Sequence, residues 1–391
     1  MSTGLHDHHQ SPPSPHAHSD APVEFRLANR ALAVVLLAVL AVGIVLSIAN
    51  PALAEIGGLG RLVSGEWTAG YQDRFEEELP LRDAAIHLWT ALRFVLLREG
   101  RHGVVVGRDG WLFTAEEFMV DPDHERWFDR NVAFVAEVRD ALGRRGIDLV
   151  VAVVPAKARI LAQADSSALG NHRKPAEAEA LLPRIHAAFD DLGITAPDLA
   201  APLAGHASTR PGSTGTSAGG AAAPVFLRTD THWTPHGARR AAEAVAPSVR
   251  GLLDRRASAP VELDVQPLAA REHRGDLMSF LPLGPFAAPL GFPPETVWPW
   301  HAEAADAPAV GLFDEVAVPV TLIGTSYSAG ELWGFDTFLR AEVGTDVLNL
   351  AEEGRGPFAP MRDYLGGTVI DEVPPDVVIW EIPERYFATA W

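Results

Sequence analysis

The chain has 391 residues, of which 47% are apolar, a net charge of −19 and no cysteine. This length allows one large catalytic domain or two modest ones. The acidic balance argues against a nucleic-acid partner, which needs basic patches, and the lack of cysteine excludes disulfides, thiol nucleophiles and cysteine-ligated metal sites.

The amino-terminal part predicts a membrane anchor. Residues 1–24 are polar, low in complexity and rich in histidine, which predicts a disordered cytoplasmic tail over 1–30, with metal binding by the histidines as the alternative. Residues 31–54 carry no charge, and a helix of about 20 residues crosses a bilayer. Because arginines precede this run, the positive-inside rule predicts a single inner-membrane pass with the remainder in the periplasm or at the outer face. A signal peptide cleaved near Ala54 is the alternative, and it also exports the chain.

The next elements follow an α/β rhythm. The spacing of apolar residues predicts helices over 61–100, divided at Pro80, and a hairpin over 101–113. Further along, the pattern predicts an amphipathic helix over 125–145, a strand at 147–155, a helix at 176–192 and a short strand at 194–199. The run at 147–155 is continuously apolar, as in a parallel sheet covered on both faces.

The second half is interrupted but continues the same sheet. Residues 204–223 form a Ser/Thr/Gly/Ala tract, which predicts a flexible insert within one domain spanning 61–391. Residues 254–315 are Pro-rich and are expected to be irregular. The regular elements expected here are a helix at 235–253, strands at 320–323, 346–350 and 376–382, and a helix at 357–365.

A serine follows one of these strands. The apolar run Val320–Ile323 ends at Gly324-Thr325-Ser326. A serine at the carboxyl end of a buried strand is a common nucleophile in α/β enzymes. The alternative is that Ser326 or Ser328 only caps the following helix.

A histidine and an aspartate supply what such a serine would need. Asp230 and His232 come at the end of an extended run, immediately before a helix, and two-residue spacing directs both side chains to one side. The imidazole could take the serine proton, and the carboxylate could orient the imidazole. Direct contact between the two side chains would require a local bend. His236 is a rival base that we expect to be solvated. Asp230, His232 and His236 could instead bind zinc, but their spacing fits no strong zinc pattern, and we predict neither metal nor cofactor.

Two groups are candidates for stabilising an oxyanion. The backbone N–H of Tyr327 is adjacent to the serine, and the amide of Asn349 follows a strand. Asn349 could equally be a turn residue. Trp380, Glu381 and Arg385 lie either at an exposed strand end or in a carboxylate–guanidinium pair that closes the fold, and we favour the structural role.

These residues lie in motifs that resemble those of the alginate O-acetyltransferase family, the AlgJ/AlgX-type, SGNH-hydrolase-like proteins. The resemblance covers most of the predicted exported part. The specific motifs are TDTHW at 229–233 and GTSYS at 324–328, supported by GRDGWLF at 107–113, VVPAKARI at 153–160, RGDL at 274–277, NLAEEGRGPF at 349–358 and VIWEIPERY at 378–386.

The resemblance implies a three-layer α/β/α sandwich with a mostly parallel sheet in permuted order. It also implies a triad with Ser326 as nucleophile, His232 as base and Asp230 as its orienter. The implied function is transfer of acetyl groups to the hydroxyls of an exopolysaccharide through an acetyl-serine, with a membrane-bound O-acyltransferase as the donor partner. Since the chain ends shortly after IPERY, the single-domain, membrane-anchored AlgJ type is the closer likeness.

Two other functions remain open from the sequence. A carbohydrate acetylesterase would use the same acyl-enzyme and resolve it with water. A non-catalytic component of an exopolysaccharide assembly complex would not use the triad at all. The sequence does not identify the polymer.

Overall fold

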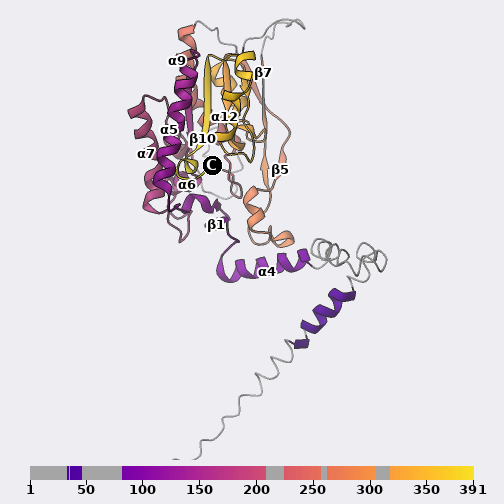
Figure 1. The fold of residues 1–391 in the computed structure, drawn as a ribbon. Helices are drawn as coiled ribbons and strands as arrows, with labels where there is room; N and C mark the ends of the chain where they lie inside the picture. The colour runs from indigo at the N-terminus through magenta and orange to yellow at the C-terminus, as the bar shows by residue number, and fades with distance from the viewer. Residues whose placement is uncertain (1–32, 35, 46–81, 208–223, 257–261, 305–317) are drawn as a thin grey trace, which may run out of the picture. The chain divides into compact units, whose positions relative to one another are not determined.

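The computed structural model describes residues 33–34, 36–45, 82–207, 224–256, 262–304 and 318–391 (Figure 1). The chain divides into two units, residues 1–85 and 86–391, and each is considered by itself. In the first unit, residues 33–34 and 36–45 are helical, so the predicted tail and half of the predicted span 31–54 lie outside the described residues. Within the described ranges, we find no helix that combines the length and the apolar character needed to cross a bilayer.

The second unit is built on a parallel sheet of four strands in the order β3-β10-β8-β9. These strands are β3 (Asp148–Val154), β10 (Val377–Pro383), β8 (Val320–Ile323) and β9 (Val347–Asn349). The last strand in the sequence, β10, lies between β3 and β8, with Val377 opposite both Asp148 and Val320. The strands predicted from continuous apolar runs are therefore confirmed, within one or two residues at each end.

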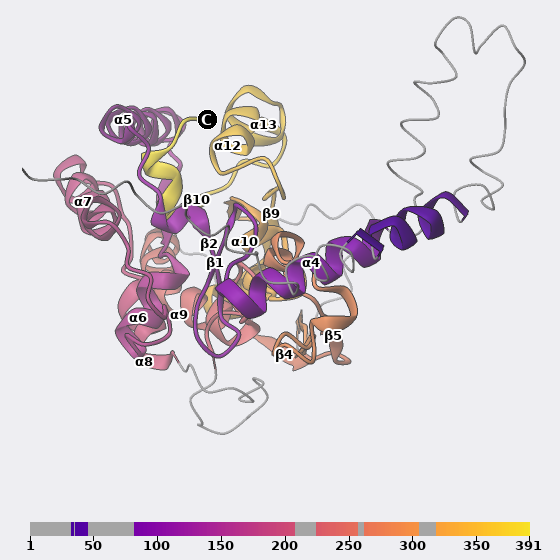
Figure 2. The same ribbon diagram turned by 90° about the horizontal axis from the view of Figure 1, so that it is seen from below.

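Helices cover both faces of this sheet, because alternate side chains of each strand point to opposite sides. Val150 and Ala152 of β3 join one core, and Leu149 and Val151 join the other. The first core is closed by α6 (Lys157–Ala164), α8 (Ala200–His206), α9 (Pro235–Leu253) and α11 (Phe335–Val343). The second is closed by α5 (His124–Gly143), α7 (Ala176–Leu192), α12 (Phe358–Gly366) and α13 (Val369–Glu372). Figure 2 shows α5, α12 and α13 on one side of the sheet and α9 on the other.

Smaller elements surround the sheet. The predicted hairpin is present as β1 (Val104–Val106) and β2 (Leu112–Thr114), joined through Asp109 and Gly110, which both have positive φ. Helix α4 (Arg82–Leu97) buries Ala91 and Phe94. The remaining short elements are η2 (Ala115–Phe118), η3 (Asp254–Arg256), η4 (Asp276–Phe280), η5 (Gly284–Phe286), α10 (Ser326–Ala329) and η6 (Glu384–Ala388).

Three expectations differ from the structure. The short strand at 194–199 is reduced to one bridge between Thr195 and Val150, because Pro197 cannot donate to a ladder. The stretch 254–315 is not simply irregular, because it contains two antiparallel pairs: β4 (Leu263–Pro267) with β7 (Trp300–Ala304), and β5 (Arg271–His273) with β6 (Glu295–Val297). The first residues of the predicted insert, 204–206, end helix α8, and residues 208–223 lie outside the described part of the chain.

Candidate active site

Ser326 sits on a tight turn at the carboxyl end of β8. The strand ends at Ile323, and the chain then enters α10 with Thr325 as the N-cap, whose hydroxyl accepts the backbone N–H of Tyr327 at 3.3 Å. Thr325, and not Ser328, therefore caps the helix. Ser326 is left as the first helical residue, and its side chain is available to the loop that precedes α9.

Glu381 of the neighbouring strand β10 holds this turn in place through hydrogen bonds. Its fully buried carboxylate accepts the Thr325 N–H at 2.7 Å and the Ser328 hydroxyl at 3.1 Å. Burial raises the pKa of Glu381 to about 7. A Cβ at position 324 would lie 2.6 Å from the Glu381 carboxylate, so the close approach requires glycine. Glu381 thus bonds to the serine turn, whereas Arg385 pairs with Glu116 at 2.8 Å.

Asp230 and His232 lie in a loop that folds back on itself. The loop is closed by a bridge between Phe226 and Trp233 and by the Leu227 N–H, which donates to the carbonyl of His232 at 3.0 Å. Asp230 Oδ1 accepts the backbone N–H of His232 at 2.9 Å, as an Asx turn does. This is the local bend that direct contact between the two side chains requires.

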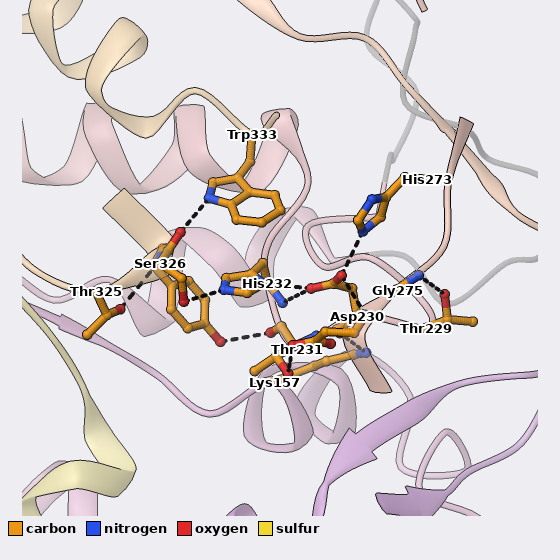
Figure 3. Close-up of polar contacts among 12 residues, drawn as sticks. Lys157, Thr229, Asp230, Thr231, His232, His273, Gly275, Thr325, Ser326 and Trp333 are labelled. Carbon is orange, nitrogen blue, oxygen red and sulfur yellow. Dashed lines mark hydrogen bonds and ion pairs between the residues drawn. The ribbon is translucent and has the colours of Figure 1, made fainter. Parts of the chain in front are cut away.

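The structure brings Ser326, His232 and Asp230 into one hydrogen-bonded chain (Figure 3). Nδ1 of His232 lies 2.6 Å from Asp230 Oδ1, and Nε2 lies 2.7 Å from the Oγ of Ser326. Because a carboxylate only accepts, Nδ1 carries a proton, and the neutral form of the ring presents a lone pair on Nε2 to the serine hydroxyl. Burial works against ionisation of Asp230, but hydrogen bonds from His232 and His273 hold its pKa below the ordinary value.

The second carboxylate oxygen of Asp230 is also fully engaged. Oδ2 lies 2.7 Å from Nε2 of His273 and accepts the backbone N–H of Asp276 at 3.0 Å. Asp276 in turn accepts the N–H and hydroxyl of Thr231 at 2.8 and 2.7 Å. Our sequence reasoning did not identify His273 or Asp276 as site residues, although the RGDL motif at 274–277 pointed to this segment.

Lys157 anchors the same loop from the first turn of α6. Its buried ammonium donates to the carbonyls of Leu112, Arg228 and Asp230 at 2.6, 3.1 and 2.9 Å. Three acceptors use all three N–H bonds of a charged ammonium. Burial lowers the pKa of Lys157 to about 8. This one side chain therefore joins three segments whose motifs are far apart in the sequence.

Trp333 covers the imidazole. Its ring stacks on His232 with centroids 4.2 Å apart and an interplanar angle of 11°. The indole N–H donates to the carbonyl of Ser326 at 3.0 Å, so Trp333 contacts both members of the Ser–His pair. Trp333 was not among the predicted site residues either, because nothing in the local sequence distinguishes it from a core aromatic.

The two predicted oxyanion donors are already hydrogen-bonded within the protein. The Asn349 amide donates to the carbonyl of Ser328 at 2.9 Å, and its oxygen accepts the N–H of Ala351 at 3.1 Å. Asn349 therefore ties β9 to the serine turn. The N–H of Tyr327 makes only the long 3.3 Å bond to Thr325. The role of either group toward an oxyanion stays a prediction.

His236 is not solvated as expected. It is half-buried, its ring centroid lies 6.0 Å from that of His206, and burial together with Arg240 lowers its pKa to about 4. Among the described residues, the acidic and imidazole atoms that gather within 4.8 Å of one another come from Asp230, His232 and Asp276. The alternative zinc set that includes His236 is thus not the one that the fold assembles, and the hydrogen bonds above account for the polar atoms of the Asp230–His232–Asp276 cluster.

The chain is similar to several known proteins. The family described as "SGNH hydrolase-like domain, acetyltransferase AlgX" matches residues 104–384. A protein named probable alginate O-acetylase AlgJ from Azotobacter vinelandii is 38% identical over 335 residues, covering 84% of this chain and 81% of that protein. The protein of the same name from Pseudomonas aeruginosa is 36% identical over 365 residues, covering 89% and 88%.

A solved structure is similar as well. The O-acetyltransferase domain of Pseudomonas putida AlgJ matches with a TM-score of 0.62 and 36% identity, covering 74% of this chain and 93% of that one.

Proposed function

The chain belongs to the SGNH hydrolase-like family of AlgX-type acetyltransferase domains, and from this we propose that it is an O-acetyltransferase of exopolysaccharide biosynthesis that uses an acetyl-serine intermediate. The observation that carries the proposal is the chain of short hydrogen bonds from Ser326 through His232 to Asp230, at 2.7 and 2.6 Å. The acceptor that we propose is an alginate-type uronate polymer, because the relatives are named alginate O-acetylases.

In the first half-reaction, Nε2 of His232 takes the proton from Ser326 as Oγ attacks the carbonyl carbon of an acetyl donor. The imidazolium that forms is stabilised by the carboxylate of Asp230. The tetrahedral intermediate then collapses, and the leaving oxygen or sulfur of the donor takes the proton from His232. The acetyl group is left as an ester on Ser326.

In the second half-reaction, a sugar hydroxyl enters next to His232. Nε2 takes its proton while the oxygen attacks the acetyl-serine, and the collapse returns the proton to Ser326 Oγ. The N–H of Tyr327 and the amide of Asn349 are our candidates for binding the oxyanion, and the loss of one such donor typically costs about 10²–10³ in rate. Asn349 would have to exchange its bond to Ser328 for this role.

We also propose that the chain works outside the cytoplasm. The uncharged run at 31–54, preceded by Arg26 and Arg30, supports an inner-membrane anchor with the catalytic domain in the periplasm. Since acetyl-CoA is cytoplasmic, a membrane-bound O-acyltransferase would have to deliver the acetyl group across the membrane.

The test is transfer by the purified full-length chain. It is incubated with p-nitrophenyl acetate and mannuronate oligosaccharides, and mass spectrometry follows acetylated sugar and, after acid quenching, acetyl on the peptide that holds Ser326. We expect both products from the native chain and neither from Ser326→Ala. The matched control Ser166→Ala changes an exposed serine and should keep full activity.

Two results would overturn the proposal. Acetate release without acetylated sugar, across uronate and neutral oligosaccharides, would identify an esterase. Unchanged acetyl transfer by a folded Ser326→Ala protein would show that the serine is not the nucleophile.

A further inference from the structure

Asp230 is held between two histidines. Its Oδ1 faces Nδ1 of His232 at 2.6 Å, and its Oδ2 faces Nε2 of His273 at 2.7 Å (Figure 3). The side chain of Asp230 is 2% exposed and that of His273 is 24% exposed, so a buried carboxylate contacts an imidazole that reaches solvent. Nothing in the reaction described above requires this second histidine.

We propose that His273 is a positioning residue for acyl transfer. It holds Oδ2 of Asp230 so that Oδ1 stays in line with His232, and it sets how much negative charge the carboxylate presents to the His232 ring. The proposal rests on the proposed function of the Ser326 site. His273 touches neither Ser326 nor the acetyl group and acts only through Asp230.

The position of His273 is imposed by the fold. It is the last residue of β5, and its neighbour across the β5–β6 pair is Glu295. Glu295 accepts the backbone N–H groups of Arg228 and Thr229 at 2.9 and 3.0 Å, which fixes the Asp230 loop against the same pair of strands. The imidazole therefore approaches Asp230 from a rigid element, whereas a residue on a free loop would not orient it.

The charged groups that face His273 are acidic. They are Asp230 from its own loop, Glu295 from β6 and Asp276 from η4, and the hydrogen bond to Asp230 is the largest influence that raises the pKa of His273. As the pH falls, His273 gains a proton and a positive charge next to Asp230. That charge offsets the carboxylate, so the imidazolium of His232 is less strongly stabilised.

The experiment measures the reactivity of Ser326 itself. The full-length native chain and its variants are treated with phenylmethylsulfonyl fluoride across a range of pH, and intact-mass spectrometry gives the rate of sulfonylation, with Ser326→Ala as the blank. His273→Ala removes the donor. His273→Gln keeps an N–H close to the position of Nε2 but cannot become charged. His301→Gln, at an exposed histidine on β7, is the matched control.

We expect His273→Ala to slow sulfonylation roughly 10-fold, as expected for loss of a hydrogen bond to a charged group, and His273→Gln to restore most of the rate. In His273→Gln the acid limb of the pH profile should move to higher pH, by up to about one unit, because Asp230 then keeps its full charge at low pH. His301→Gln should match the native profile in both respects.

The inference is overturned if both His273 variants have the sulfonylation rate and pH profile of the native chain. It is also overturned if His273→Ala is sulfonylated more slowly but the acid limb of the pH profile does not move in His273→Gln. These outcomes leave the proposed function standing, because Ser326 is still modified. If the native chain is not sulfonylated at Ser326 at all, the proposed function fails first. Melting temperatures of all variants show whether a slow rate reflects unfolding.

Discussion

The carboxylate of Glu381 accepts the backbone N–H of Thr325 at 2.7 Å, one residue before the serine. Glu381 lies in β10, and Thr325 follows the end of the neighbouring parallel strand β8, so the sheet itself sets the position of the turn. A wholly buried carboxyl group therefore holds the turn in place. Its ionisation should change both the stability of the fold and the position of the turn that presents Ser326.

This relationship predicts a pH-dependent stability that Glu381→Gln removes. Burial raises the pKa of Glu381 from 4.5 to about 7 in the folded state. A raised pKa gives a stabilising contribution that is complete below the unfolded value and is lost as the pH rises through the folded value. Relative to Glu381→Gln, the native chain should therefore lose on the order of 3 kcal/mol of unfolding free energy between pH 4.5 and pH 8.

Urea unfolding of both proteins across this range measures the difference. Glu353→Gln, at an exposed glutamate, is the control, and its unfolding free energy should change with pH as that of the native chain does. If the unfolding free energy of Glu381→Gln shows the same pH dependence as that of the native chain, the carboxyl group does not titrate as its burial indicates.

A second prediction concerns Trp333. Trp333→Phe keeps an aromatic ring over His232 but removes the N–H that donates to Ser326, so we expect a roughly 5-fold loss of esterase kcat on p-nitrophenyl acetate with little change in KM. Trp333→Ala also removes the stacking and opens a cavity, and it should cost about 3–5 kcal/mol of stability. Trp89→Phe, at an exposed tryptophan, is the control. An unchanged kcat in Trp333→Phe would mean that the indole hydrogen bond has no part in orienting Ser326.

Much of this fold and site is visible in the sequence, for physical reasons. Buried parallel strands must be apolar on both faces, so the runs that became β3, β8 and β10 were recognisable. The predicted helix at 235–253 is confirmed as α9, which begins at Pro235 with Thr234 as its N-cap. The serine and the Asp–His pair were identified because their chemistry restricts residue types and because the motifs resemble those of a known family.

What the sequence did not predict depends on long-range contacts. The pairing of β4 with β7 joins segments far apart, with Val265 opposite Ala302. Each strand alternates apolar and polar residues over only five positions, too few to stand out within a Pro-rich stretch. The bend that lets Asp230 reach His232 is stabilised by Lys157, and His273 reaches Asp230 across 43 positions. Trp333 looks like any core aromatic until the stacking on His232 is seen. Such residues are defined by their partners, and a local pattern carries no information about partners.

Lys157 gives a third prediction. Lys157→Met keeps the length of the side chain but leaves the buried carbonyls of Leu112, Arg228 and Asp230 without their donor. We expect a loss of at least about 3 kcal/mol of unfolding free energy, because unsatisfied buried polar groups cost about 1–3 kcal/mol each and do not add fully. Activity per folded molecule should also fall, since the Asp230 loop loses its anchor. Chemical denaturation measures the first effect, and kcat on p-nitrophenyl acetate measures the second. Native-like stability would show that water can replace the ammonium.

The last prediction tests how tightly the Asp230 loop is packed. A Cβ at Gly275 would lie 2.0 Å from the carbonyl oxygen of Thr229 and 2.6 Å from the backbone nitrogen of Asp230. Both contacts are with backbone, so Gly275→Ala must displace the loop, and we expect a loss of kcat of at least about 10-fold because an acid–base pair tolerates little misplacement. Gly251→Ala is the matched control. It lies within α9 with open space around its Cβ, and the change should leave kcat intact and raise stability by up to about 1 kcal/mol. If both alanine variants keep native kcat, the loop has more freedom than its packing indicates, and the alignment of Asp230 with His232 does not depend on Gly275.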